Sequence, residues 1–136
     1  MGTVVETAIA LFGCIKAGII PVCTLPQHRE IEIGEVSARS NAKAHFVQAD
    51  FSGFDLAGFA QSMASRQRAM RNIVVARGGS PAGTLSFDAL IDGISLPEAR
   101  NRLAGIAIGA EDVLAFQLSG GTTGAPKIIP RFHGEY

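Results

Sequence analysis

The sequence predicts an α/β fold, with a mainly parallel sheet covered by helices on both faces. Short apolar runs typical of buried strands recur along the chain, and segments with a helical period of about 3.6 lie between them. The chain has 136 residues, of which 47% are hydrophobic, enough for one domain with a real core. No internal repeat or interdomain linker is visible, so we expect a single domain over residues 1–136.

The first half of the chain predicts two helix and strand pairs. Thr3 and Glu6 have capping-box spacing, and Gly18 is a natural helix stop. The helix between them has one apolar stripe, formed by Val5, Ala8, Ile9, Phe12 and Ile15. The run IIPVC at 19–23 is interpreted as a short buried strand. A second helix at about 30–41, ending near Asn41, and a strand at 44–48 follow.

Asp55 is expected to cap a third helix. Its apolar side comprises Leu56, Phe59, Ala60, Met63 and Met70, and its last turn carries Arg66, Arg68 and Arg71, where the helix dipole favours cations. The later elements are expected as a strand at 72–76, a loop at 77–84, short helical pieces at 85–91 and 95–105, a buried strand at 112–118, and a short strand at 128–130 closed by Pro130.

Charge and composition exclude several classes of protein. Twelve basic residues balance twelve acidic ones, so no overall field favours nucleic acid or an anionic membrane. The longest apolar runs fall far short of the roughly 20 residues that span a bilayer, and no signal-peptide pattern precedes them. We therefore expect a cytoplasmic protein. Cys14 and Cys23 lie among apolar neighbours and are expected as buried thiols, with a disulfide or zinc site as the alternative.

The loop at 118–127 follows the last buried strand and has an unusual composition. It contains three hydroxyls, three glycines and a lysine: Ser119, Thr122, Thr123, Gly120, Gly121, Gly124 and Lys127. Glycine backbone, hydroxyl donors and a compact cation suit a polyphosphate, and strand ends are the usual address of ligands in α/β sheets. A Walker A loop is excluded, because Ala125 and Pro126 precede the lysine and no helix follows. The alternative is a glycine-rich hairpin turn.

The string SGGTTGAPK resembles the phosphate-binding signature of the adenylate-forming enzymes, a superfamily of acyl- and aryl-CoA ligases, luciferases and peptide-synthetase adenylation domains. More narrowly, QLSGGTTGAPKIIPRFHGEY and ALFGCIKAGIIPVCTLPQHREIEIG resemble aryl-acid AMP ligases that begin siderophore synthesis, such as 2,3-dihydroxybenzoate-AMP ligase. The likeness covers most of the chain, although 77–105 is nondescript. Phe132 stands where those ligases usually have threonine.

This resemblance implies a reaction and a set of ligands. The carboxylate of an aryl acid, of the 2,3-dihydroxybenzoate or salicylate type, would attack the α-phosphorus of ATP with Mg²⁺ assisting. The acyl group would then pass to a pantetheine thiol on an aryl carrier protein, or to coenzyme A in the related CoA ligases. The hydroxyls and glycines of the loop would hold the β- and γ-phosphates. Lys127, the implied catalytic residue, would either contact these phosphates or steady the loop.

The resemblance also implies that residues 1–136 are a partial domain, a fragment of the N-terminal AMP-binding region of a longer enzyme. We expect this fragment to be inactive alone and capable of self-association. A non-catalytic phosphate-binding or interaction module is the alternative of another class. His28 and His133 remain open between a ligand contact and a structural role, and Arg131 between a phosphate contact and an ion pair. His45 and Asp112 are interpreted as structural residues.

Overall fold

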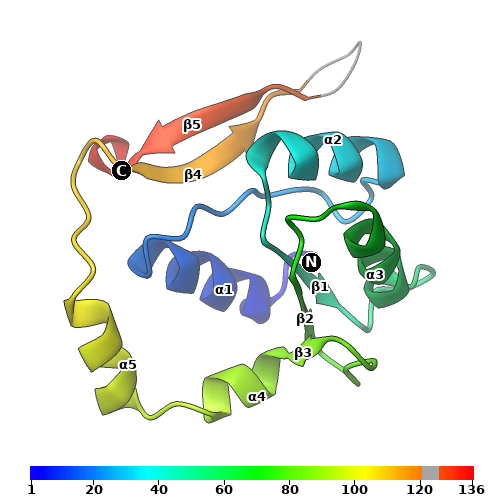
Figure 1. Ribbon diagram of the computed structural model, residues 1–136, viewed down its shortest axis with the longest axis horizontal. Coiled ribbons are helices and arrows are strands. Elements are labelled where there is room, and N and C mark those ends of the chain that lie inside the picture. Colours follow the sequence, from blue (N-terminus) through cyan, green and yellow to red (C-terminus); the bar gives the residue numbers. More distant parts are fainter. Residues whose placement is uncertain (121–125) are drawn as a thin grey trace. The chain divides into compact units, whose positions relative to one another are not determined.

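The computed structural model describes residues 1–120 and 126–136, whose contacts divide into two compact units (Figure 1). The first unit comprises residues 1–4 and 25–93, and the second comprises 5–24 and 94–136. In chain order the elements are α1 (Val5–Lys16), α2 (Glu30–Ser40), β1 (Ala44–Gln48), α3 (Leu56–Arg66), β2 (Asn72–Ala76), β3 (Leu85–Ser86), α4 (Phe87–Asp92), α5 (Leu96–Ala104), β4 (Val113–Leu118), β5 (Ile128–Phe132) and the 3₁₀ turn η1 (His133–Glu135).

A parallel sheet in the order β1-β2-β3 organises the first unit. The strands β1 and β2 begin and end at the predicted residues and pair in register from Ala44 opposite Asn72 to Gln48 opposite Ala76. Helix α3 packs against both strands, and α4 contacts β2 and β3. The main core consists of Val47, Leu56, Ala57, Ala60, Ile73 and Val75. Helices packed on a parallel sheet confirm the predicted α/β class.

Two helix ends in the first unit follow from local sequence. The backbone N–H of Gly58 donates to Asp55 Oδ1 at 2.9 Å, so Asp55 caps α3 as predicted. Helix α2 ends at Asn41, which adopts the left-handed conformation with φ 51°. The predicted extent of α3 was too long, because Gln67 is extended and its side chain donates to the carbonyl of Gly34 on α2 at 3.1 Å. Arg68, Met70 and Arg71 therefore follow the helix.

Helix α1 belongs to the second unit and ends as predicted. Gly18 has φ 66°, and the N–H of Ile19 donates to the carbonyl of Cys14 at 2.9 Å, closing a Schellman-type end. None of the α1 residues is buried, and Val5 and Phe12 are 64% and 62% exposed. The apolar stripe predicted for this helix therefore faces outward. The expectation of buried thiols was also wrong: both cysteines are free, with Cys14 half-buried on this helix and Cys23 exposed.

Three predicted strand or helix boundaries were wrong, each because of a pairing between distant segments. The stretch 19–23 forms only a bridge from Val22 to Phe116, because Pro21 has no N–H with which to extend a ladder. Leu85–Ser86 pairs with β2 as β3, so the helix predicted at 85–91 begins at Phe87. Strand β5 passes through Pro130, which an edge strand tolerates when its missing N–H faces away from the partner.

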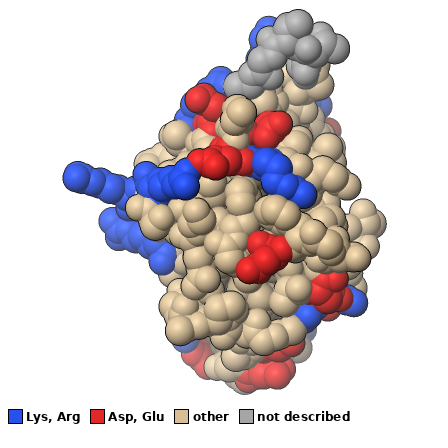
Figure 2. All heavy atoms as spheres, turned by 90° about the vertical axis from the view of Figure 1, so that its right-hand side faces the viewer, with Lys and Arg blue, Asp and Glu red and all other residues tan. Residues whose placement is uncertain are grey.

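The remaining elements of the second unit match their predicted segments. Helix α5 begins after Ser95, whose hydroxyl accepts from the N–H of Glu98 at 3.4 Å. Strand β4 starts after Asp112, whose carboxylate accepts from the N–H of Gly109 at 2.7 Å, as expected of a turn residue. Acidic and basic side chains occur together on the face displayed in Figure 2, with uncharged surface between them.

Candidate functional site

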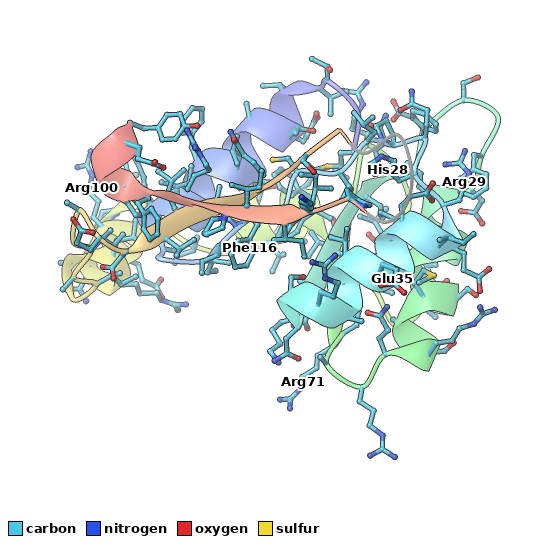
Figure 3. The ribbon with its side chains drawn as sticks, turned by 90° about the horizontal axis from the view of Figure 1, so that it is seen from above. His28, Arg29, Glu35, Arg71, Arg100 and Phe116 are labelled. Atoms are coloured by element: carbon cyan, nitrogen blue, oxygen red, sulfur yellow. The ribbon has the colours of Figure 1, made fainter. Side chains whose placement is uncertain are left out.

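The candidate loop leaves the end of β4, a strand paired along both of its edges. On one edge β4 runs antiparallel to β5, with Leu118 opposite Ile128. On the other edge the N–H of Phe116 donates to the carbonyl of Pro21 at 2.9 Å, beside the parallel bridge to Val22 (Figure 3 labels Phe116). Pairing on both sides makes β4 a fixed support for the loop.

Ser119 and Lys127 close the base of the loop. The N–H of Ser119 donates to the carbonyl of Lys127 at 3.0 Å, and the N–H of Lys127 donates to Ser119 Oγ at 3.2 Å. A hydroxyl has one proton to donate besides the lone pairs that accept, so Ser119 Oγ can hold Lys127 and still donate to an anion. The structure thus brings together two of the predicted site residues.

Lys127 and Gly120 are both exposed. A Cβ added to Gly120 would have no described atom within 4 Å, and this glycine has no left-handed backbone. The described part of the fold therefore does not itself demand glycine at this position. A glycine has no side chain to hinder a phosphate that approaches its backbone N–H. The other predicted site residues, Gly121, Thr122, Thr123 and Gly124, lie outside the described residues, and their roles stay predictions.

Arg131 forms an ion pair, one of the two readings that its sequence position allowed. Its Nε lies 3.5 Å from Glu135 Oε2, which also accepts from the N–H of Phe132 at 2.9 Å. The guanidinium lies over the ring of Tyr136 at 5.8 Å. A hydrogen bond with the Tyr136 side chain, followed by the negative charge of Glu135, raises the pKa of Arg131 above its ordinary value. This arginine therefore stays charged and is engaged locally.

His133 belongs to the second unit, whereas His28 and His45 belong to the first. His133 follows β5 at the end opposite Lys127, so about 20 Å of extended chain separates the two residues. His28 lies in the turn before α2 in the first unit, where its Nδ1 accepts from the N–H of Leu25 at 3.4 Å (Figure 3). His45 is half-buried in β1, its Nε2 lies 3.2 Å from Ser37 Oγ, and burial lowers its pKa to about 4. These contacts give His28 and His45 structural partners.

Sequence reasoning missed the contact between Gln117 and Tyr136. Gln117 Nε2 donates to Tyr136 Oη at 3.1 Å. Strand alternation was the available signal, because residues two apart on a strand share a face and Gln117 is two residues before Ser119. The position of Tyr136 depends on the turn after β5, which no pattern of comparable strength indicates in the sequence.

The described residues contain neither a cluster suited to a metal ion nor a helix suited to a membrane. Within 1–120 and 126–136, no group of three or more His, Cys, Asp or Glu side chains is arranged to hold a metal ion. None of the helices found in these ranges has the length and apolar character that crossing a bilayer requires.

Comparison with protein families matches residues 1–136 to the model described as "AMP-binding enzyme". The chain belongs to the AMP-binding enzyme family. This assignment confirms the superfamily that the loop sequence resembled, and it covers the whole chain, including the nondescript stretch 77–105.

Individual relatives agree with the family assignment. The 2,3-dihydroxybenzoate-AMP ligase of Bacillus subtilis is 34% identical over 127 residues, covering 93% of this chain and 22% of that protein. Salicyl-AMP ligase / salicyl-S-ArCP synthetase of Mycobacterium tuberculosis is 36% identical over 135 residues, covering 96% of this chain and 22% of that protein. The apo structure of MbtA from Mycobacterium smegmatis is 32% identical with a TM-score of 0.82, covering 99% and 23%. This member of the AMP-binding family thus spans less than a quarter of the length of each relative.

Proposed function

We propose that residues 1–136 form part of an adenylate-forming ligase that activates an aryl carboxylic acid with ATP for siderophore synthesis. The observation that carries this proposal is the family match over the entire chain. The similarity to a 2,3-dihydroxybenzoate-AMP ligase and a salicyl-AMP ligase supports an aryl acid of that type as the substrate. A cytoplasmic location is part of the proposal, since such a reaction consumes ATP.

In the proposed reaction a carboxylate oxygen attacks the α-phosphorus of ATP. The new P–O bond forms as the bond to the β-phosphate oxygen breaks, and pyrophosphate leaves with the electron pair. Negative charge grows on the leaving group, so donors placed there in advance accelerate the step. Ser119 Oγ and the Gly120 backbone would donate to the β- and γ-phosphates together with Gly121, Thr122, Thr123 and Gly124. Lys127 would supply the positive charge.

Magnesium fits this donor set as an ion held mainly by the nucleotide. Mg²⁺ takes oxygen ligands and commonly binds through substrate phosphates with few protein groups. The described residues offer a serine hydroxyl at the loop base and no cluster of carboxylates. When bound, the ion would neutralise charge on the departing pyrophosphate.

The second half-reaction would transfer the acyl group to a pantetheine thiol. We propose an aryl carrier protein as the acceptor, supported by the salicyl-S-ArCP synthetase among the relatives. The thiol sulfur would attack the acyl carbon, and AMP would leave. Because the chain spans only 22% of that relative, we propose that residues 1–136 do not complete either half-reaction alone.

Pyrophosphate exchange into ATP by the full-length polypeptide that carries this chain tests the proposal. We expect exchange to require 2,3-dihydroxybenzoate or salicylate, with hexanoate as an aliphatic control. Exchange driven by hexanoate but by neither aryl acid would reject the aryl-acid assignment. Supplying carrier protein and coenzyme A in parallel identifies the acceptor. ATP binding with no exchange for any acid would favour a non-catalytic phosphate-binding module.

A further inference from the structure

One face of the β4–β5 hairpin carries the loop base and a second group of polar side chains. Residues alternate between faces along a strand, so Ala115, Gln117 and Ser119 share one face of β4. Ala115 is opposite Arg131, and Gln117 is opposite Ile129. Lys127 continues this face beside Ser119. Gln117 therefore lies two residues, about 7 Å along the strand, from the rung formed by Ser119 and Lys127.

The end of the chain turns back onto this same face. Tyr136 meets it at two points, because its hydroxyl accepts from Gln117 Nε2 at 3.1 Å and its ring lies 5.8 Å from the Arg131 guanidinium. The turn itself begins with the bond from the N–H of Phe132 to Glu135 Oε2 at 2.9 Å. Gln117 and Tyr136 are 19 residues apart in sequence, so their bond ties the end of β4 to the segment that follows β5.

We propose that Gln117 and Tyr136 are positioning residues for Ser119 and Lys127. The Ser119–Lys127 rung is the last described rung of the ladder, and one of its two hydrogen bonds uses a side chain, so it is prone to open. The Gln117–Tyr136 bond restrains β4 next to that rung and keeps it closed. This inference rests on the proposed function in one respect, namely that the rung supports a phosphate-binding loop.

Four variants of the full-length polypeptide separate this role from simple folding. Gln117→Leu and Tyr136→Phe each remove the bond, and their combination tests whether the two residues act as one unit. Gln117→Glu keeps a bond, because a carboxylate accepts from the tyrosine hydroxyl. Gln61→Leu is the matched control: Gln61 Nε2 also donates one exposed hydrogen bond, to the carbonyl of Ala82 at 2.9 Å, in the first unit.

Hydrogen exchange read by mass spectrometry is the readout that does not depend on activity. We expect peptides spanning 117–127 to exchange about three to ten times faster in Gln117→Leu and Tyr136→Phe, corresponding to the usual net contribution of one hydrogen bond. Peptides of the first unit should not change, and Gln61→Leu should leave 117–127 as in wild type. Gln117→Glu should restore most of the protection.

Steady-state pyrophosphate exchange gives the second readout. The two single variants should each lower kcat/KM for ATP about three- to tenfold and leave KM for the aryl acid within twofold. The double variant should be no worse than Tyr136→Phe alone, because without the tyrosine hydroxyl Gln117 has lost the bond through which it acts.

The inference is overturned if hydrogen exchange at 117–127 in Tyr136→Phe equals that of the wild type, or if protection falls equally throughout the protein. It is also overturned if the two substitutions lower kcat/KM additively. A wild-type protein with no acid-dependent pyrophosphate exchange would reject the proposed function instead. In that case hydrogen exchange at 117–127 still decides whether Gln117 and Tyr136 hold the rung.

Discussion

At the scale of single residues, the loop base shows how one side chain can serve both the fold and a ligand. Ser119 Oγ takes the place of a strand carbonyl in accepting the N–H of Lys127 at 3.2 Å. An alanine at 119 would leave that N–H without its acceptor, whereas threonine would retain the oxygen. A hydroxyl can accept one hydrogen bond and donate another, so the same atom can hold the loop base and donate to a phosphate.

Under the proposed function, replacing Lys127 with alanine is expected to slow acyl-adenylate formation by the full-length polypeptide more than tenfold. Loss of a preorganised group that stabilises developing charge typically costs about 2 to 4 kcal/mol in the transition state. Pyrophosphate exchange measures the effect, and Lys43→Ala, another exposed lysine, is the matched control. Rates within twofold of wild type would remove Lys127 from the site.

His45 should make the stability of the first unit fall as the pH is lowered from 7 to 5. Burial lowers its pKa from 6.5 to about 4, with the positive N-terminus contributing less. Between pH 6.5 and about 4 the unfolded chain therefore binds a proton at His45 that the folded chain does not bind. The stability present above pH 6.5 is lost as the pH falls toward 4. The loss between pH 7 and pH 5 should be about 1 to 2 kcal/mol.

Urea unfolding at the two pH values tests this histidine effect. His45→Gln can keep a hydrogen bond to Ser37 without a titrating group, so its stability should change less between pH 7 and pH 5 than that of the wild type. His133→Gln, in the second unit, is the control for the replacement of a histidine by glutamine. Equal pH dependence in His45→Gln and wild type would contradict the assignment to His45.

At the scale of helices and strands, local signals predicted what local interactions determine. Asp55 begins α3 and Asn41 ends α2 through contacts within a few residues. The local sequence was therefore sufficient to predict these two helix ends. The predictions for 19–23 and 85–86 were wrong because the structure of these segments depends on which distant strand they pair with. The prediction that Pro130 closes the strand was wrong for the same reason. A strand tolerates proline only where the missing N–H faces away from the partner strand, and this depends on the pairing of β5.

The cap of α3 provides a test at this scale. Asp55→Ala removes the acceptor for the N–H of Gly58 and should destabilise the first unit by about 1 kcal/mol. Thermal or urea unfolding measures the change, and Asp55→Asn should recover most of it, because asparagine is also a strong N-cap. Asp88→Ala, in the first turn of α4, removes a carboxylate that is not the N-cap. A smaller loss for Asp55→Ala than for Asp88→Ala would show that the cap contributes little.

At the scale of the whole molecule, the sequence predicted the loop at 118–127 but not the contacts that hold its base. The string around Ser119 and Lys127 was sufficient to indicate the family, because it resembles the family's signature directly, and the family match confirms that assignment. The bond between Gln117 and Tyr136 depends on how a turn returns to a strand, which composition does not encode. Helix α1 was predicted from its apolar stripe, yet that stripe is exposed, because periodicity tells which residues share a face but not what covers it.

The exposed stripe of α1 leads to the expectation that the isolated 136-residue chain self-associates. Val5, Ile9 and Phe12 lie at helical spacing and are 64%, 47% and 62% exposed. Contiguous apolar surface of this kind promotes association. A formal net charge of zero provides little repulsion between copies. Sedimentation velocity should therefore show dimers or larger species at concentrations of tens of micromolar.

Phe12→Glu should shift the purified chain toward the monomer, because association would bury an unpaired carboxylate. Asn101→Glu adds the same charge at an exposed position of α5 and should leave the association as in wild type, which separates the local effect of α1 from the change in net charge. Far-UV circular dichroism of both variants checks that the helices remain. A wild-type chain that is monomeric across the concentration range, or a Phe12→Glu chain that associates as strongly as wild type, would show that the α1 stripe does not drive association.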